Sequence, residues 1–465
     1  MSRADLVVRG GSVYQRSQLV EADLVVVEGR IAAIVDRATA LESLAIEADR
    51  EIDATGLAVL PGAIDTHTHS REPGYTHKED FETVSRAAAV GGVTTFVDMP
   101  NVEPPTDTLE TFLDKRSAAE GRCFVDWGHW AAGTKVDEIP KLAEAGVTGY
   151  KIFQVSGAYP HDPRLAINDE GDLVAAFRAI ARTGLPCLVH PFNQALFDRL
   201  SEEAFAEGKP PNGRTFSEIY TTDAIWSTAV HTLLALQRLT GVRLHLLHTH
   251  AAGSLRLIRQ AKQGGSKVTC EIDPKYYHFT LEHLERLGAR MVPGGFVTAD
   301  DDRMAEIWRS LQDGTVDNIG TDHAPHTLDE VAVADIDAWN ANLGSPQIEW
   351  VYPIVLTDVA AGRHSLSRAV ELLCENPAKL LGVWPRKGTL LPGSDADFVL
   401  VDLDERYVVT EERVQSKVGW SPYVGWELQG EIKTTVLRGA VIADQGDVVA
   451  DARDGRYVAG HPQRS

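Results

Sequence analysis

Six side chains that can ligate metal ions lie in or directly after apolar, strand-like segments of this chain. They are His67 and His69 in DTHTHS, Lys151 in GYKIF, His190 in CLVH, His248 in LHLLH and Asp322 in IGTDHAPH. Histidines that alternate along a strand share one face, so His67 and His69 are expected to point to the same side. Neutral imidazole and carboxylate oxygen bind zinc and related cations, and a catalytic site leaves one position open for water. The set predicts a hydrolytic centre that holds two divalent cations over one water.

Lys151 lies in the apolar run GVTGYKIFQV, where an unpaired ammonium is costly. A protonated amine is of no use beside two cations. After reaction with carbon dioxide the side chain becomes a carboxylate that can bridge them. We therefore expect a carbamylated (N-carboxylated) Lys151, with an ordinary solvated or paired lysine as the alternative.

Asp322 ends an apolar strand segment and has two plausible roles. It can cap the turn that follows, or it can ligate a metal ion and carry a proton. In the second role Asp322 takes the proton of the attacking water and passes it to the leaving nitrogen. We favour the second role and predict Asp322 as the catalytic residue.

Other histidines lie near these segments. His250 would share the face of His248 on an extended chain, but His248 closes the apolar run, so His248 is the predicted ligand and His250 a loop residue near the site. His129 also closes a strand segment, and structural packing is its favoured role. His323 and His326 flank the turn after the last strand, where His326 is the better candidate for a substrate contact.

The middle of the chain, residues 59–385, alternates strand-like and helix-like segments. Strands are expected at VLPGAIDTH, 92–99, 124–130, 146–153, 186–190, 243–248, 267–272 and 316–322, and several intervening helices end in Gly. Eight strand–helix units with nearly continuous apolar strands indicate a (β/α)8 barrel of the TIM type. A doubly wound open sheet is the alternative. The barrel is favoured because candidate ligands close strands one, four, five, six and eight, whose ends ring one mouth.

Both ends of the chain have a different pattern from the middle. Residues 1–58 and 386–465 contain short β-branched runs broken by Gly and Pro. We expect them to form one small β-sandwich domain made from both ends. A chain of 465 residues exceeds the size at which a single core stops growing, so a second domain is expected.

Composition narrows the class of partner. The formal net charge is −22, a field that repels phosphate backbones and anionic lipid, so neither nucleic acid nor membrane surface is an expected partner. The four cysteines are too few for a disulfide framework and are expected to be free. With neither a signal-like start nor a run of 18 apolar residues, the sequence predicts a cytoplasmic protein.

Several segments resemble blocks of one family. PGAIDTHTHSREPG resembles the strand-one signature of the cyclic amidohydrolases, the dihydroorotase, allantoinase and hydantoinase group of the amidohydrolase superfamily. GGVTTFVDMPN, GYKIF, VTCEIDP, GTDHAPH and LPGSDADFVLVD resemble later blocks, and dihydroorotase is the closest member by these motifs. The resemblance implies a (β/α)8 barrel with a composite β domain, two metal ions, usually zinc, and a homo-oligomer, either a dimer or a tetramer.

The same resemblance implies a role for each of the six candidate ligands. His67, His69 and Asp322 would hold one metal ion, His190 and His248 the other, and carbamylated Lys151 would bridge them. The implied reaction is hydrolysis of a small cyclic amide by a bridging hydroxide, with Asp322 protonating the leaving nitrogen.

Substrate contacts are implied at Arg71, Asn101 and His326, positions that dihydroorotases use for a substrate carboxylate. A guanidinium suits a carboxylate through two parallel hydrogen bonds, although Arg71 can instead form a loop salt bridge. Lys275 stands where dihydroorotases commonly have a histidine. It can supply a second cation for an acidic substrate, or it can be a surface lysine.

The leading prediction is therefore a dihydroorotase-like ring hydrolase. The first alternative is a hydantoinase (dihydropyrimidinase) or allantoinase that acts on a neutral cyclic ureide or imide. The second is a scaffold homologue that has lost catalysis, which retention of all six ligands argues against.

Overall fold

A computed structural model describes residues 3–36, 46–157, 162–292, 301–449 and 451–462. Eight parallel strands form one sheet in sequence order: β7 Ala63–Thr68, β8 Val93–Asp98, β9 Asp126–Ala132, β10 Gly149–Phe153, β11 Pro186–His190, β12 Arg243–Leu246, β13 Thr269–Ile272 and β14 Asn318–Ile319. The sheet closes where Thr68, at the end of β7, forms a parallel bridge with His323, just beyond β14. This arrangement is the predicted (β/α)8 barrel.

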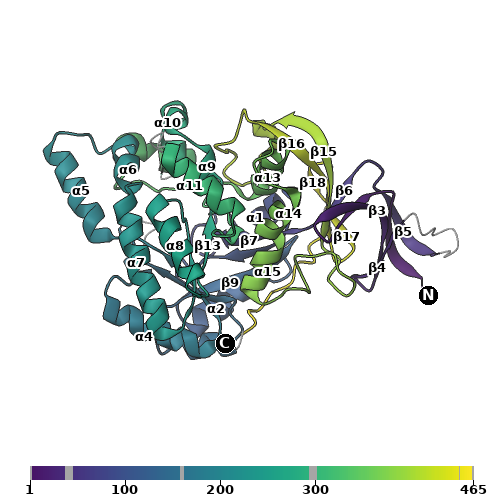
Figure 1. Ribbon diagram of the computed structural model, residues 1–465, viewed down its shortest axis with the longest axis horizontal. Helices are drawn as coiled ribbons and strands as arrows, with labels where there is room; N and C mark the ends of the chain where they lie inside the picture. The colour runs from purple at the N-terminus through teal and green to yellow at the C-terminus, as the bar shows by residue number, and fades with distance from the viewer. Residues whose placement is uncertain (1–2, 37–45, 158–161, 293–300, 450, 463–465) are drawn as a thin grey trace.

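Helices surround the barrel (Figure 1). They are α1 Phe81–Val90, α2 Leu109–Ala119, α3 Ile139–Glu144, α4 Glu170–Thr183, α5 Gln194–Ala206, α6 Gly213–Tyr220, α7 Asp223–Thr240, α8 Ala252–Gln263, α9 Lys275–His278, α10 Leu281–Leu287, α11 Asp301–Gln312, α12 Leu328–Ala332, α13 Val351–Ala360, α14 Leu366–Val370 and α15 Asn376–Leu381. Helices α4 and α7 end at Gly184 and Gly241, both at positive φ, as the sequence predicts for helix terminators.

The remaining strands form a separate mixed sheet at the other side of the molecule (Figure 1). They are β1 Ala4–Arg9, β2 Ser12–Gln15, β3 Gln18–Val27, β4 Arg30–Asp36, β5 Ala48–Asp53, β6 Ala58–Pro61, β15 Phe398–Val408, β16 Glu427–Leu437, β17 Ala440–Asp444 and β18 Asp447–Val448. Strand β6 pairs antiparallel with β15, so both ends of the chain build this domain, as predicted. Its own apolar cluster includes Leu24, Phe398 and Val436.

After the small domain the chain returns to the barrel. Tyr457 forms a parallel bridge with Trp127 of β9, and the amide of Gly455 donates to the carbonyl of Cys123. The C-terminus therefore lies beside the barrel and away from the N-terminus (Figure 1). The domain limits 1–58, 59–385 and 386–465 stay a prediction.

Candidate metal centre and active site

Five of the six predicted ligands surround one small cavity at the carboxyl ends of the barrel strands. The cavity has a volume of about 40 Å³, and its walls are His67, His69, Arg71, Asn101, Phe153, His190, Tyr220, His248, Tyr276, Asp322, Ala324, Leu343 and Gly344. Parallel strands in a barrel end at one mouth, so residues far apart in the sequence meet there. The sixth ligand, Lys151, is fully buried in β10 and is not among these wall residues.

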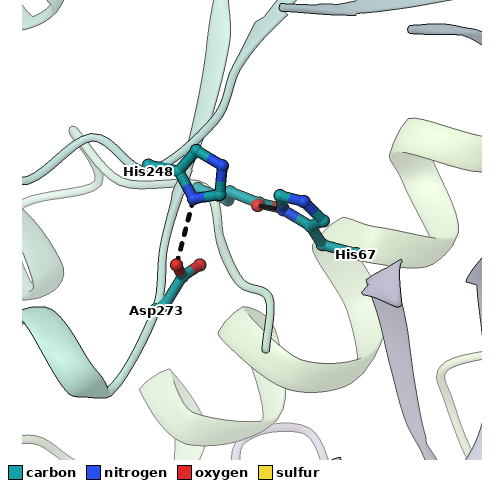
Figure 2. A group of neighbouring side chains, drawn as sticks. His67, His248 and Asp273 are labelled. Atoms are coloured by element: carbon teal, nitrogen blue, oxygen red, sulfur yellow. Dashed lines mark hydrogen bonds and ion pairs between the residues drawn. The ribbon is translucent and has the colours of Figure 1, made fainter. Parts of the chain in front are cut away.

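The histidine rings lie in contact with one another. The ring centroids of His67 and His248 are 4.7 Å apart, and those of His190 and His248 are also 4.7 Å apart. Oδ1 of Asp322 lies 3.2 Å from Nε2 of His69 and 3.3 Å from Nε2 of His67. Figure 2 shows the approach of His67 and His248, and its dashed line joins Nδ1 of His248 to Oδ2 of Asp273, 3.1 Å away.

Donor atoms gather here in two overlapping groups. Among the described residues, ligand atoms within 4.8 Å of one another belong to His67, His69 and Asp322, and to His67, His248, Glu271 and Asp273. Two imidazoles with a carboxylate make a common site for a divalent cation, and the two groups share His67. The residues present therefore suit a pair of neighbouring metal ions.

Protonation of the imidazoles agrees with this role. Burial lowers the pKa of His248 to about 4 and holds the pKa of His69 well below its ordinary value. Both rings are then neutral at neutral pH, and neutral imidazole is the form that ligates a metal ion.

Glu271 of β13 orients the first of these ligands. Its Oε1 pairs with Nδ1 of His67, while its Oε2 accepts a hydrogen bond of 3.2 Å from the hydroxyl of Thr66. The Nε2 of His67 is thereby left facing Asp322. A carboxylate behind a metal-binding histidine fixes the ring and its tautomer in this way. Burial opposes ionisation of Glu271, but the charges and hydrogen bonds of His67 and His245 outweigh it and lower the Glu271 pKa.

Lys151 is a fully buried amine without a hydrogen-bond partner among the described residues. The Nζ lies 4.4 Å from the centre of the Phe153 ring, which lines the cavity. Burial lowers the pKa of Lys151 to about 7. An uncharged amine is the form that reacts with carbon dioxide, so the environment of Lys151 suits carbamylation.

Asp322 is bound from both sides. Its Oδ1 faces His67 and His69, whereas its Oδ2 accepts a hydrogen bond of 2.7 Å from Nζ of Lys275. Burial raises the Asp322 pKa, but the charges of Lys275 and His67 outweigh it and hold that pKa well below its usual range. Lys275 is itself buried, with 4% of its side chain exposed, so it is not a surface lysine. It lies behind Asp322 and is not among the residues of the cavity wall.

Arg71 and Asn101 form part of the cavity wall. Arg71 is fully buried; its Nε donates to the carbonyl of Pro325 (3.0 Å), and one terminal nitrogen lies 3.0 Å from Nε2 of His326. The other ring nitrogen of His326 lies 3.1 Å from Nζ of Lys78. His326 therefore stands behind Arg71 and outside the cavity wall, and its role as a direct substrate contact stays a prediction.

The other histidines near the strand ends have structural partners. Nδ1 of His250 lies 2.7 Å from the carbonyl of His248, and its ring stacks on Tyr276 with 4.2 Å between centroids. His323 accepts a 2.9 Å hydrogen bond from the amide of Gln347, and His129 is buried 3.5 Å from Asp98. None of the three is in the cavity wall.

Sequence reasoning missed four residues of the site. Glu271 and Asp273 alternate in VTCEIDP, and that spacing on a strand was a usable signal for a shared face. Tyr220 and Tyr276, which bring phenol groups to the cavity, come from helices α6 and α9, where nothing in the local sequence marks them.

The backbone is strained at this site. Arg71, His248 and Asp322 have φ values of 64°, 51° and 46°, a left-handed region that L-residues seldom adopt. Such conformations cost of the order of 1 kcal/mol each and persist where the surroundings enforce them. Their clustering at one cavity is a mark of a functional site.

The Amidohydrolase family pattern matches residues 58–442, which covers the barrel and much of the small domain. The chain belongs to the amidohydrolase family. An L-hydantoinase from Paenarthrobacter aurescens is 34% identical over 463 residues, covering 98% of both proteins. An allantoinase from Deinococcus radiodurans is 35% identical over 454 residues, covering 97% of both.

Solved structures of hydantoinases are also similar to this amidohydrolase. An L-hydantoinase (dihydropyrimidinase) from Arthrobacter aurescens superposes with a TM-score of 0.91 at 33% identity, covering 98% of this chain and all of the other. A D-hydantoinase superposes with a TM-score of 0.88 at 28% identity over 99% of this chain. The protein is a cyclic amidohydrolase with a buried metal-binding cluster. These relatives do not confirm the expected closest likeness to dihydroorotase.

Proposed function

We propose that this amidohydrolase opens the ring amide of a neutral five-membered cyclic ureide, a hydantoin that carries a large apolar group. Two divalent metal ions, zinc by preference, would be held by His67, His69 and Asp322, by His190 and His248, and by carbamylated Lys151. The observation that carries the proposal is the meeting of these side chains at one cavity, where His67, His69 and Asp322 form one donor group and the rings of His190 and His248 lie 4.7 Å apart.

Bound divalent cations supply a deprotonated water at neutral pH and polarise a carbonyl oxygen. The chain's own residues then supply position and proton transfer. Asp322, at the centre of the cluster, would take the proton from the attacking water and deliver it to the ring nitrogen as the amide bond breaks. Arg71, Asn101, Tyr220 and Tyr276 line the cavity and can hold the ring by hydrogen bonds to its carbonyl and N–H groups.

A second cavity beside the metal centre favours an apolar substituent. This aromatic pocket has a volume of about 230 Å³ and shares Tyr220 and Leu343 with the cavity of the metal centre. Its walls are Val155, Ser156, Gly157, Phe192, Gln194, Phe197, Asp198, Phe216, Tyr220, Ala338, Trp339, Ala341 and Leu343. An engineered cavity of about 150 Å³ admits benzene, so the aromatic pocket has room for an aryl group.

Two polar side chains of the aromatic pocket, Gln194 and Trp339, already have partners. The side-chain oxygen of Gln194 accepts from the amide of Ser156 (3.0 Å), and its nitrogen donates to Asp198 (2.7 Å). The indole nitrogen of Trp339 donates to the hydroxyl of Ser201 at 3.3 Å. The polar ureido group of allantoin would lose hydrogen bonds to water here, at a cost of about 1–3 kcal/mol. We therefore favour hydantoins that carry an apolar substituent over allantoin, whose substituent is the polar ureido group.

The first test compares 5-benzylhydantoin, unsubstituted hydantoin and allantoin on one metal-loaded preparation. We expect kcat/KM for 5-benzylhydantoin to exceed that for allantoin by at least about tenfold, because a site rejects a polar group that it leaves unpaired. Ala341→Phe would fill the aromatic pocket. It should lower kcat/KM for 5-benzylhydantoin by at least about tenfold and leave unsubstituted hydantoin within about twofold.

The control is Ala361→Phe, at an exposed position after α13, which should change kcat/KM for neither substrate. Preference for allantoin over 5-benzylhydantoin would refute the assignment of the substituent. If the metal-loaded enzyme hydrolyses none of these ring substrates, the hydrolase proposal itself is refuted.

A second candidate is the dihydroorotase-like reaction on a ring that bears a carboxylate. Arg71 supports it, because its buried guanidinium lines the cavity of the metal centre. Dihydroorotate in the same substrate panel tests this candidate. If it is the substrate, Arg71→Ala should cost about 2 kcal/mol or more in kcat/KM for dihydroorotate.

The cellular setting is also proposed. Cys123, Cys187, Cys270 and Cys374 are all free and buried, which supports a reducing, cytoplasmic location. Among the described residues no helix has the length and apolar character to cross a membrane. A homo-dimer or tetramer stays an expectation from the family.

A further inference from the structure

Lys275 pairs with two acidic groups of the metal centre. As the first residue of α9, it places its Nζ 2.7 Å from Oδ2 of Asp322 and 3.4 Å from Oδ2 of Asp273. Asp322 is a proposed metal ligand, and Asp273 lies 3.1 Å from Nδ1 of the proposed ligand His248. The positive charge of Lys275 therefore lies beside the place where the metal cations are expected to bind.

The two oxygens of Asp322 have different neighbours. Oδ1 lies 3.2–3.3 Å from the Nε2 atoms of His69 and His67, whereas Oδ2 faces Lys275. A cation bound by Oδ1 and the two histidines would not displace the ammonium. The metal ion and Lys275 would then share one carboxylate, and two like charges that close together repel strongly inside a protein.

Without metal ions the same ammonium has the opposite effect. Glu271 and Asp273 are fully buried carboxylates, and the side chain of Asp322 is only 19% exposed. Buried charges without partners are costly. Glu271 is paired with His67 and Asp273 with His248, and Lys275 supplies the positive charge beside Asp273 and Asp322. Lys275 thus stabilises the metal-free protein and opposes the metal-bound one.

We propose that Lys275 is an internal counter-ion that sets the divalent-metal affinity of this site. The proposal rests on the proposed metal centre. It assigns Lys275 a positioning role through Asp322 and Asp273, in place of a direct contact with the substrate.

The test replaces Lys275 by Met, which keeps the length of the side chain and removes its charge. The dissociation constant for Zn²⁺ or Co²⁺ is measured by chelator competition, and the melting temperature of the metal-free protein by calorimetry. We expect Lys275→Met to tighten metal binding at least about tenfold and to lower the melting temperature of the metal-free protein. Lys275→Arg, which keeps the charge, should stay close to wild type in both.

Lys387 provides a matched control. Its Nζ lies 2.6 Å from both Asp126 and Asp397 and 3.3 Å from Asp395, so it is also a buried ammonium among carboxylates, at the amino end of β9. Lys387→Met should lower the melting temperature and leave metal affinity unchanged. If Lys275→Met does not fold, Lys275→Gln takes its place in the same measurements.

Metal affinity that is unchanged or weaker after removal of the Lys275 charge would overturn the counter-ion role. Tighter binding in Lys387→Met would also overturn it, because the effect would then not be local. If the wild-type protein binds no divalent cation at all, the proposed metal centre is refuted. If wild type and Lys275→Met bind the cation with equal affinity, only the counter-ion role is refuted.

Discussion

At the scale of single residues, burial decides which chemical form each ligand takes. His248 and His69 are held neutral by desolvation, and the same effect lowers the pKa of Lys151 to about 7. Burial raises the Asp322 pKa, but the charge of Lys275 is the largest of the effects that outweigh it and hold that pKa well below its usual range. The fold thus prepares neutral imidazoles, a carboxylate and a reactive amine in one place.

Lys151 provides the prediction at this scale. Lys151→Ala should lower the metal content of purified protein from the proposed two ions per chain to about one or fewer, because the carboxylate that a carbamylated Lys151 would supply is lost. Acetate can supply a carboxylate to the space that the lysine side chain leaves, and it should restore part of the metal content. Elemental analysis with and without acetate checks this. Lys141→Ala, an exposed lysine on α3, is the control, and full metal content in Lys151→Ala would contradict a bridging role.

At the scale of elements, the barrel strands set the register that brings Glu271 under His67. Glu271 of β13 is paired with Asn318 of β14, and Gly320 directly follows β14. A Cβ at Gly320 would lie 2.6 Å from Oε2 of Glu271. The chain can carry only glycine there without moving the carboxylate that orients His67.

Gly320→Ala is therefore expected to weaken divalent-metal binding by about 10- to 100-fold, the usual cost of disturbing a group that orients a metal ligand. Chelator competition measures the change. Gly171→Ala, at an exposed position in the first turn of α4, should leave the affinity as in wild type. Wild-type affinity in Gly320→Ala would mean that Glu271 does not position His67.

At the scale of the whole molecule, a buried ionic cluster joins the barrel to the small β domain. Asp126 of β9 is 2% exposed; it accepts hydrogen bonds of 2.6 and 2.7 Å from Arg438 and lies 2.6 Å from Nζ of Lys387. Lys387 also contacts Asp397, just before β15. The two domains are therefore linked through charges that neither could bury alone.

Asp126→Asn keeps the shape of the side chain and removes its charge. It should destabilise the protein by about 3 kcal/mol, because the buried Lys387 and the partly buried Arg438 lose their shared partner. Thermal unfolding checks this as a fall in melting temperature. Asp137→Asn, an exposed acid after β9, should leave the melting temperature unchanged. An unaltered melting temperature in Asp126→Asn would show that the cluster does not hold the domains together.

The sequence by itself determined the fold class and the list of candidate ligands. Strand periodicity and glycine helix ends are local signals, so the barrel and the β domain from both chain ends could be predicted, and the fold is confirmed. His67, His69, His190 and His248 could be named because each lies in or just after a strand segment, and barrel strands end at one mouth.

Only the tertiary structure decided what stands beside and behind those ligands. Lys275 is bound to Asp322, and His326 lies behind Arg71, because loops from distant parts of the chain pack against the strand ends. The aromatic pocket likewise joins α6 to residues 338–343. Such contacts depend on the path of loops in space, which has no periodicity for the sequence to display, and these contacts point to the substrate.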